Sequence, residues 1–319
     1  MIIDAHNHPD WHGHDLKKFI ARLLLACGLF VVIFGLPSAI LLTCRFRDCA
    51  QRADRFLSPR VGTKILVLGD SHARAFVEGA CGIRKIAATA NPLNMSLMRL
   101  KEFEKRGGLK GVDTCVVTFC HTAFCEMTCE AQMLAMWHFL PLSLDHIDLM
   151  PMNRFDLWSG LLDVTIRNIG ETPSMAWDYS KVDPADDRPS LAERPAEWVR
   201  RAARETLARH FSWEKRPESL VQDMDGFLVR IMMEMKSICD AHGVRLFFVS
   251  TPLPEVYRNG IPDWAKLQFS VWQDRIRSLG IKYFDCMDIG DPEWFMDADH
   301  LNDKGAKRFT EMFCSRYFK

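Results

Sequence analysis

Residues 64–74, with the sequence KILVLGDSHAR, constrain most strongly what this chain can fold into. The apolar, β-prone run at 65–68 predicts a buried strand, and the Gly-Asp that follows predicts a tight turn at its end. The next stretch, 73–78, is compatible with a helix. Ser71 stands at the turn, at the carboxyl end of the strand, where open α/β sheets place their ligand sites.

The chain from residue 62 onward alternates between strand-like and helix-like patterns. After the first strand, apolar β-prone runs occur at 84–88, 114–119, 245–249 and 282–284. Helical spacing occurs at 95–106, 198–211, 220–242, 264–279 and 303–316. Strands that alternate with helices predict a mostly parallel sheet with helices on both of its faces.

A long segment, about 123–219, separates the third and fourth predicted strands. Connections of this length without secondary structure are uncommon in compact domains, so we expect a helical insertion. Part of this insertion is a candidate lid over the site at the end of the first strand.

Composition narrows the class of protein. The chain has 319 residues, 48% of them hydrophobic, which is enough for a full core. Its 41 basic and 41 acidic side chains balance, so the basic footprint of a nucleic-acid-binding protein is missing and we expect no nucleic-acid partner. The eleven cysteines are odd in number and show no repeated short spacing, so we expect most to be buried or free thiols. That expectation favours a reducing or oxygen-poor setting.

Residues 23–43 carry no charge and have the length that a helix needs to cross a bilayer. They predict a single-pass transmembrane anchor, with the lipid bilayer as a partner; a buried core helix is the alternative. The sequence then divides into a tail at 1–22, this span, a juxtamembrane linker at 44–61 and a folded domain at 62–319.

The tail is rich in histidine, and its start, with His6-x-His8, resembles the first strand of a metal-dependent amidohydrolase. The resemblance ends after some fifteen residues, and a membrane span follows in place of the barrel and further ligands that such an enzyme needs. We therefore expect a flexible tail here, and no metal or cofactor in the folded domain.

A serine nucleophile needs an adjacent base and a group that orients the base. The candidates lie near the C-terminus, in Asp297-Ala-Asp-His300, where Asp297 and His300 are close enough in sequence to fold onto each other. Roles without catalysis stay open, because Ser71 could cap a helix and His300 could be a surface histidine.

Gly69-Asp70-Ser71 after the first strand, with Asp-x-x-His before the last helix, resembles the SGNH/GDSL hydrolase family. The resemblance implies a flavodoxin-like three-layer α/β/α fold, with Ser71 as nucleophile and His300 as the base that takes its proton. Asp297 would hold the imidazole; Asp299 is a competing carboxylate, but the family pattern selects Asp297.

The predicted oxyanion site departs from the family pattern. The family usually has a glycine after the second strand and Gly-x-Asn-Asp after the third, where this chain has Thr-Ala-Asn91 and Cys-His121-Thr. The candidate donors are the backbone N–H of Ser71, Asn91 and His121, and a structural role stays open for the last two. Cys120, Cys125 and Cys129 beside His121 suggest zinc, but their spacing matches no paired Cys-x-x-Cys arms, so we expect packing thiols.

The resemblance implies a serine esterase or deacylase that removes acyl groups, O-acetyl groups among them, from a glycan or small ester through an acyl-Ser71 intermediate. An alternative is an O-acyltransferase that modifies a cell-envelope polysaccharide and receives its acyl group from a membrane acyl-donor protein. A second is a non-catalytic interaction module with the same fold. Membrane-anchored relatives of the fold usually face outward, so we expect the catalytic domain on the extracytoplasmic side, although the arginines after residue 44 favour the inner side.

Overall fold

The computed structural model describes residues 20–25, 54–87, 92–121, 189–211 and 218–317 of the chain. The chain divides into two compact units, 1–52 and 53–319. In the first unit the described residues, 20–25, are helical and exposed. Every element named below belongs to the second unit.

The second unit is built on a five-stranded sheet with the strand order β2-β1-β3-β4-β5, and every pair of neighbours is parallel. The strands are β1 Ile65–Gly69, β2 Ile83–Ala87, β3 Thr114–Thr118, β4 Arg245–Ser250 and β5 Lys282–Asp285. This is the order of flavodoxin-like doubly wound sheets, whose ligand sites lie where the strand order reverses, here between β1 and β3. The prediction of a parallel α/β fold is confirmed.

Helices connect the strands, and most lie within a few residues of their predicted bounds. The α-helices are α3 Leu93–Lys105, α7 Ala196–His210, α8 Glu218–Ala241, α9 Glu255–Gly260, α10 Asp263–Ser278 and α11 Asp303–Tyr317. Short 3-10 turns are η2 Ser71–Ala75, η3 Ala80–Gly82, η7 Leu191–Glu193 and η8 Pro292–Trp294.

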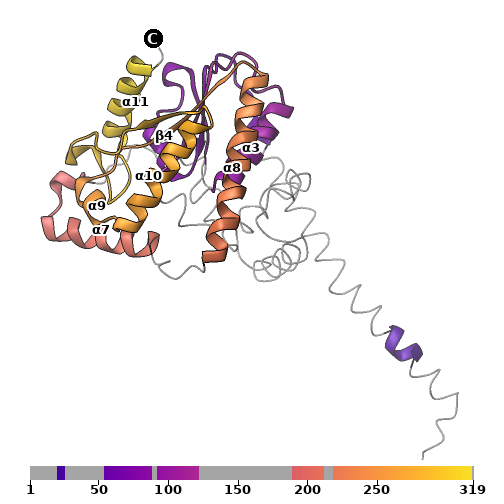
Figure 1. Cartoon of the computed structure of the whole chain (residues 1–319), viewed down its shortest axis with the longest axis horizontal. Coiled ribbons are helices and arrows are strands. Elements are labelled where there is room, and N and C mark those ends of the chain that lie inside the picture. The colour runs from indigo at the N-terminus through magenta and orange to yellow at the C-terminus, as the bar shows by residue number, and fades with distance from the viewer. Residues whose placement is uncertain (1–19, 26–53, 88–91, 122–188, 212–217, 318–319) are drawn as a thin grey trace, which may run out of the picture. The chain divides into compact units, whose positions relative to one another are not determined.

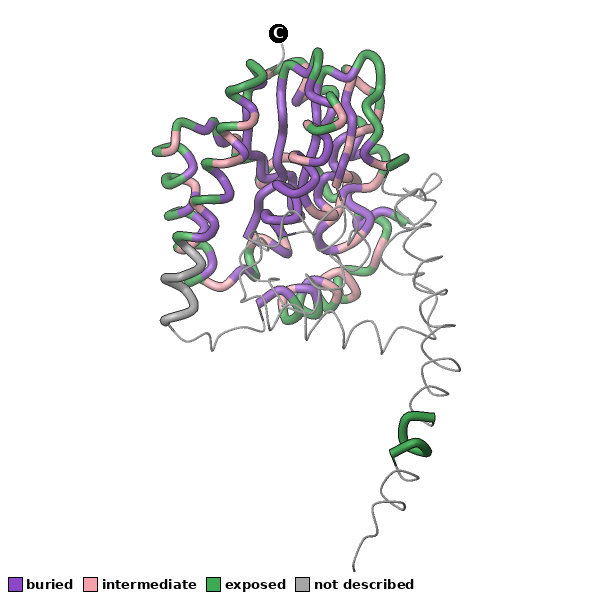
Figure 2. The backbone as a smooth tube through the Cα atoms, turned by 90° about the vertical axis from the view of Figure 1, so that its right-hand side faces the viewer, coloured by how far each residue is buried: buried purple, intermediate pink, exposed green. Residues whose placement is uncertain are grey.

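The two faces of the sheet bury separate cores. Leu66 and Leu68 of β1 pack on one face with residues of α3, α8 and α10, which lie together in Figure 1. Ile65 and Val67 point to the opposite face and pack with residues of α11. Because both faces are covered, all five residues of β1 are buried, and buried backbone fills the centre of the domain in Figure 2.

The predicted anchor at 23–43 lies almost entirely outside the described residues. Within the part of the chain that the structure describes, no helix is long and apolar enough to cross a membrane. Most of the predicted insertion, from 123 to 188, also lies outside the described residues. α7 falls within the predicted range and is helical as expected. The predicted domain boundaries stay predictions.

The prediction of a helix at 73–78 is wrong. The chain forms the 3-10 turn η2 after the first strand, and at Phe76 the backbone is extended. The physical reason is packing: Phe76 is fully buried and makes edge-to-face contacts with Phe309 and Phe313 of α11. Those contacts draw the chain away from a helical path.

The expectation that most cysteines are buried or free thiols is confirmed in part. The described free thiols are all buried: Cys115, Cys120, Cys239 and Cys286. Cys81 and Cys314, however, form a disulfide that links η3 to α11. Their separation of 233 residues explains why no short spacing could reveal this bond.

Candidate active site

The turn that carries Ser71 depends on a glycine at the end of β1. Gly69 has a φ of +129°, and a Cβ atom there would overlap Oγ1 of Thr118 on β3. The close approach lets the backbone N–H of Asp70 donate to Thr118 Oγ1 at 3.3 Å, while that hydroxyl donates to Asp70 Oδ1 at 3.1 Å. Asp70 Oδ1 also accepts from the backbone N–H of His72 and so caps η2, which fixes Ser71 at the first position of the turn.

The opposite side of the site is a loop between η8 and α11. Asp297 Oδ1 folds this loop by accepting hydrogen bonds from the backbone N–H groups of Asp299 at 3.0 Å and His300 at 2.8 Å. Asn302 then caps α11, because its Oδ1 accepts from the N–H of Gly305 at 2.8 Å.

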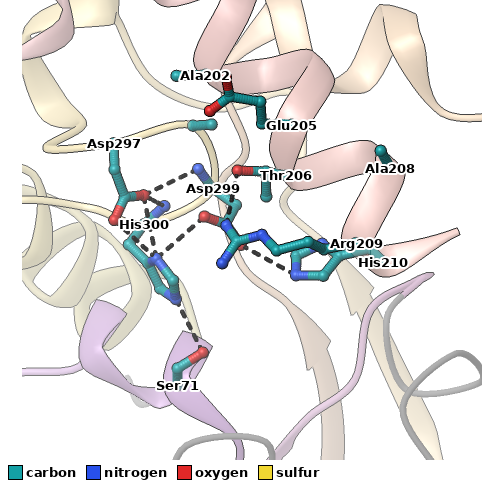
Figure 3. A pocket seen from close by; sticks show the side chains of 11 residues that line it. Ser71, Ala202, Glu205, Thr206, Ala208, Arg209, His210, Asp297, Asp299 and His300 are labelled. Carbon is teal, nitrogen blue, oxygen red and sulfur yellow. Dashed lines mark hydrogen bonds and ion pairs between the residues drawn. The ribbon is translucent and has the colours of Figure 1, made fainter. Parts of the chain in front are cut away.

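The structure brings together the three residues predicted to form a triad. His300 Nε2 lies 2.8 Å from Ser71 Oγ, and His300 Nδ1 lies 3.0 and 3.1 Å from the two carboxylate oxygens of Asp297 (Figure 3). The serine hydroxyl can donate to Nε2 while Nδ1–H donates to the carboxylate. This is the geometry in which an imidazole takes a proton from a serine.

Asp299 is a second carboxylate on the same imidazole nitrogen. Its Oδ1 lies 3.1 Å from His300 Nδ1, and its side chain is 8% exposed, against 36% for Asp297. On its other side, Asp299 Oδ2 lies 3.7 Å from Nε2 of His210 on α7, and His210 Nδ1 is 2.6 Å from the hydroxyl of Tyr257. The sequence-based choice of Asp297 therefore names only one of the two carboxylates that hold His300.

Charges around His300 change its pKa and those of its neighbours. Burial alone would lower the pKa of His300, but hydrogen bonds and negative charge from Asp297 and Asp299 raise it to about 9. Burial would raise the pKa of Asp299, but the hydrogen bond and charge of His300 lower it below its ordinary value. Burial lowers the pKa of His210 to about 4. The site thus favours an imidazolium at His300 next to ionised Asp299.

His72, the residue after the nucleophile, is buried. Its ring stacks on that of His300 with centroids 5.2 Å apart, and its Nδ1 lies 3.1 Å from Asp70 Oδ2 and 3.8 Å from Cys120 Sγ. Burial opposes its charged form, but Cys120 and Asp70 raise the pKa of His72 well above its ordinary value. His72 is therefore a buried part of the site's charge distribution.

A cavity of about 900 Å³ opens beside Ser71. One wall is the 297–300 loop, and the other is α7 (Figure 3). The wall residues from α7 are Ala202, Glu205, Thr206, Ala208, Arg209 and His210. Sequence reasoning predicted a helix here but none of these residues individually, because an amphipathic pattern does not identify what its polar face meets.

Of the other two predicted oxyanion donors, only His121 lies within the described residues. The ring of His121 stacks on Phe269 of α10 with centroids 4.2 Å apart, and His121 is not among the residues that line the cavity. Burial lowers the pKa of His121 to about 4, so its ring packs as a neutral group. Asn91 lies outside the described residues, as do Cys125, Cys129 and the histidines of the tail.

Comparisons with known proteins add little to this geometry. No family model matches the sequence, and no curated protein matches it. Among solved structures, the chain is similar to a Bacteroides fragilis protein described as a "putative acylhydrolase", with 10% identity and a TM-score of 0.36. The match covers 83% of this chain and 92% of that one. A TM-score this low does not define a shared fold. The description of the site therefore depends only on the geometry given above.

Proposed function

We propose that this protein is an SGNH/GDSL-type serine hydrolase that cleaves acyl esters through an acyl-Ser71 intermediate. The observation that carries the proposal is the 2.8 Å contact between Ser71 Oγ and His300 Nε2, with His300 Nδ1 held by carboxylates. A serine hydroxyl is a weak nucleophile unless such a base is within hydrogen-bonding distance.

In the proposed reaction, neutral His300 takes the proton of Ser71 as Oγ attacks the ester carbonyl. Asp297 and Asp299 stabilise the imidazolium that forms, and the backbone N–H of Ser71 is one donor to the oxyanion. The imidazolium then protonates the departing alcohol, which leaves the acyl group on Ser71. Water, activated by the same imidazole, attacks the acyl-enzyme and restores the free serine.

The cavity beside Ser71 favours a polar ester. Glu205, Thr206 and Arg209 offer hydrogen-bonding groups of both kinds along the α7 wall. Such a wall suits the hydroxyls of a sugar better than a long hydrocarbon chain, so the substrates proposed are O-acetyl or similar short acyl esters of a glycan or small polar molecule.

A fluorophosphonate probe tests the proposal, because it phosphonylates only an activated serine. We expect the purified protein to be labelled, and Ser71→Ala and His300→Ala to lose labelling by about 10⁴-fold or more. Ser278→Ala, which removes an exposed serine that donates to Arg275 O on α10, is the matched control and should label normally. A folded wild-type protein that does not react would overturn the proposal and favour an interaction module.

Turnover of an acetyl ester then separates hydrolysis from transfer. Release of acetate in water alone supports the hydrolase. Turnover that occurs only when a sugar acceptor is added would reassign the same triad to an acyltransferase.

A further inference from the structure

The base His300 and two side chains beside it form a cluster of potential metal ligands. One ligand atom each from His72, Asp299 and His300 lies within 4.8 Å of the other two. His72 and Asp299 are 5% and 6% exposed, so the cluster differs from the solvated acidic groups that are common on surfaces. Two imidazole nitrogens and a carboxylate oxygen are a ligand set that zinc prefers.

His72 is oriented as a ligand by its own hydrogen bond. Its Nδ1 lies 3.1 Å from Asp70 Oδ2, so in the neutral ring Nδ1 carries the proton and Nε2 carries the lone pair. Nε2 is buried and has no hydrogen-bond partner among the described residues. A carboxylate that fixes one nitrogen of a histidine while the other stays open is the usual arrangement behind a metal-binding histidine.

Another histidine flanks the cluster on the far side of Asp299. His210 has its Nδ1 2.6 Å from the hydroxyl of Tyr257, and its Nε2 faces Asp299 Oδ2 at 3.7 Å. In Figure 3 the carboxylate of Asp299 lies between the rings of His300 and His210. His210 is not one of the three clustered ligands, but it packs beside Asp299 and helps to hold that carboxylate in place.

We propose that this cluster binds a zinc-type divalent cation through His72 Nε2, the Asp299 carboxylate and His300 Nδ1, and that the bound ion switches off the catalytic base. A neutral imidazole has one proton. With the metal on Nδ1 of His300, that proton must be on Nε2, which then cannot accept the proton of Ser71. The ion also replaces Asp297 as the partner of Nδ1, so the base is lost without any movement of the serine.

Zinc binding is measured directly by calorimetry with zinc chloride. The full chain is used with His6, His8, His12 and His14 replaced by alanine, because a histidine-rich tail binds transition metals adventitiously. In this background we expect one zinc ion per chain. His72→Asn, which keeps a donor toward Asp70 but removes the open nitrogen, should weaken binding by about tenfold or more. Ser71→Ala should bind zinc as the parent does.

The functional arm uses the fluorophosphonate probe on the same proteins. Zinc should slow labelling of the parent, a chelator should restore it, and the zinc needed for half-inhibition should rise in His72→Asn by the same factor as its binding constant. Absence of zinc binding by the tail-substituted parent would overturn the proposal without any variant. So would undiminished binding by His72→Asn. Circular dichroism verifies that the variant is folded; if it is not, Asp299→Asn is measured in its place.

Zinc binding by Ser71→Ala is measured by calorimetry and does not depend on an active serine. The metal site and the proposed reaction can therefore be disproved independently of each other. A protein that binds zinc through His72 but never reacts with the probe would keep the metal site and would overturn both the hydrolase and the inhibition by zinc.

Discussion

His300 is held by two carboxylates at once, and this has consequences for when it can act as a base. Hydrogen bonds and charge from Asp297 and Asp299 overcome the effect of burial and raise its pKa to about 9. Below that pH the ring is mainly imidazolium and cannot take a proton from Ser71. The interaction that stabilises the charged intermediate thus also limits the resting base at neutral pH.

The rate of fluorophosphonate labelling should therefore rise with pH, with a midpoint near 9. Asp299→Asn removes one of the two negative partners of His300 and should move the midpoint down toward the ordinary value of 6.5. The matched control is Asp240→Asn, which removes a carboxylate that pairs with Lys236 on α8 and should leave the midpoint unchanged. A wild-type midpoint near 6.5 would contradict the assigned role of the two carboxylates.

The same shift predicts how stability depends on pH. The folded-state pKa of His300 is raised above its unfolded value, so its contribution is complete below pH 6.5 and is lost as the pH rises through about 9. We expect the free energy of unfolding of the wild type, relative to His300→Gln, to fall by roughly 3 kcal/mol between pH 6 and 10. Urea denaturation at a series of pH values measures this. A constant difference between the two proteins would rule out the shifted pKa.

At the scale of elements, the site depends on how closely β1 approaches β3. Gly69 occupies a backbone conformation with φ +129° and leaves no room for a Cβ beside Thr118. The hydroxyl of Thr118 is thereby free to bind both the backbone and the carboxylate of Asp70. A larger residue at 69 would displace that hydroxyl and with it the residue before the nucleophile.

Gly69→Ala should therefore destabilise the fold by roughly 2 to 3 kcal/mol and slow labelling of Ser71. Gly107→Ala is the control: its φ is +70°, and nothing lies within 4 Å of the added Cβ, so only backbone strain of about 1 kcal/mol is expected and labelling should not change. Thermal denaturation measures the loss of stability, and the fluorophosphonate probe measures the rate at which Ser71 is labelled. Equal effects in the two variants would show that contact with Thr118 is not important.

The strands could be predicted from the sequence because buried parallel strands are near-continuous apolar runs. The turn after β1 could not, since the extended backbone at Phe76 depends on aromatic residues of α11 more than two hundred positions away. Likewise, the motif resemblance selected Ser71, Asp297 and His300, which the fold brings together. The part played by Asp299 could not be predicted, because nothing local in the sequence indicates that it is more buried than Asp297.

At the scale of the molecule, one covalent link connects distant parts of the second unit. The Cys81–Cys314 disulfide joins the segment before β2 to α11, the helix that follows the His300 loop. Disulfides persist in oxidising compartments, so this bond argues against the reducing setting expected from the cysteine count.

Cys81→Ser and Cys314→Ser should each lower the free energy of unfolding by roughly 2 to 5 kcal/mol, as expected when a long loop is no longer closed. The double variant should lose no more than either single one, because both remove the same bond. Denaturation in urea measures the losses, and mass spectrometry of the unreduced protein should detect the joined peptides. Additive losses would show that the two cysteines act independently.

The origin of the cavity walls has a consequence for how this protein can change over time. The side chains proposed to cleave the ester come from the end of β1 and from the loop before α11. The opposite wall of the cavity comes from α7, in a separate stretch of the chain. Mutations in that stretch can change which substrate the cavity binds without changing the residues that would cleave its ester bond. A lineage of such proteins could therefore acquire new substrates by drift within α7 alone, while keeping one inherited chemistry.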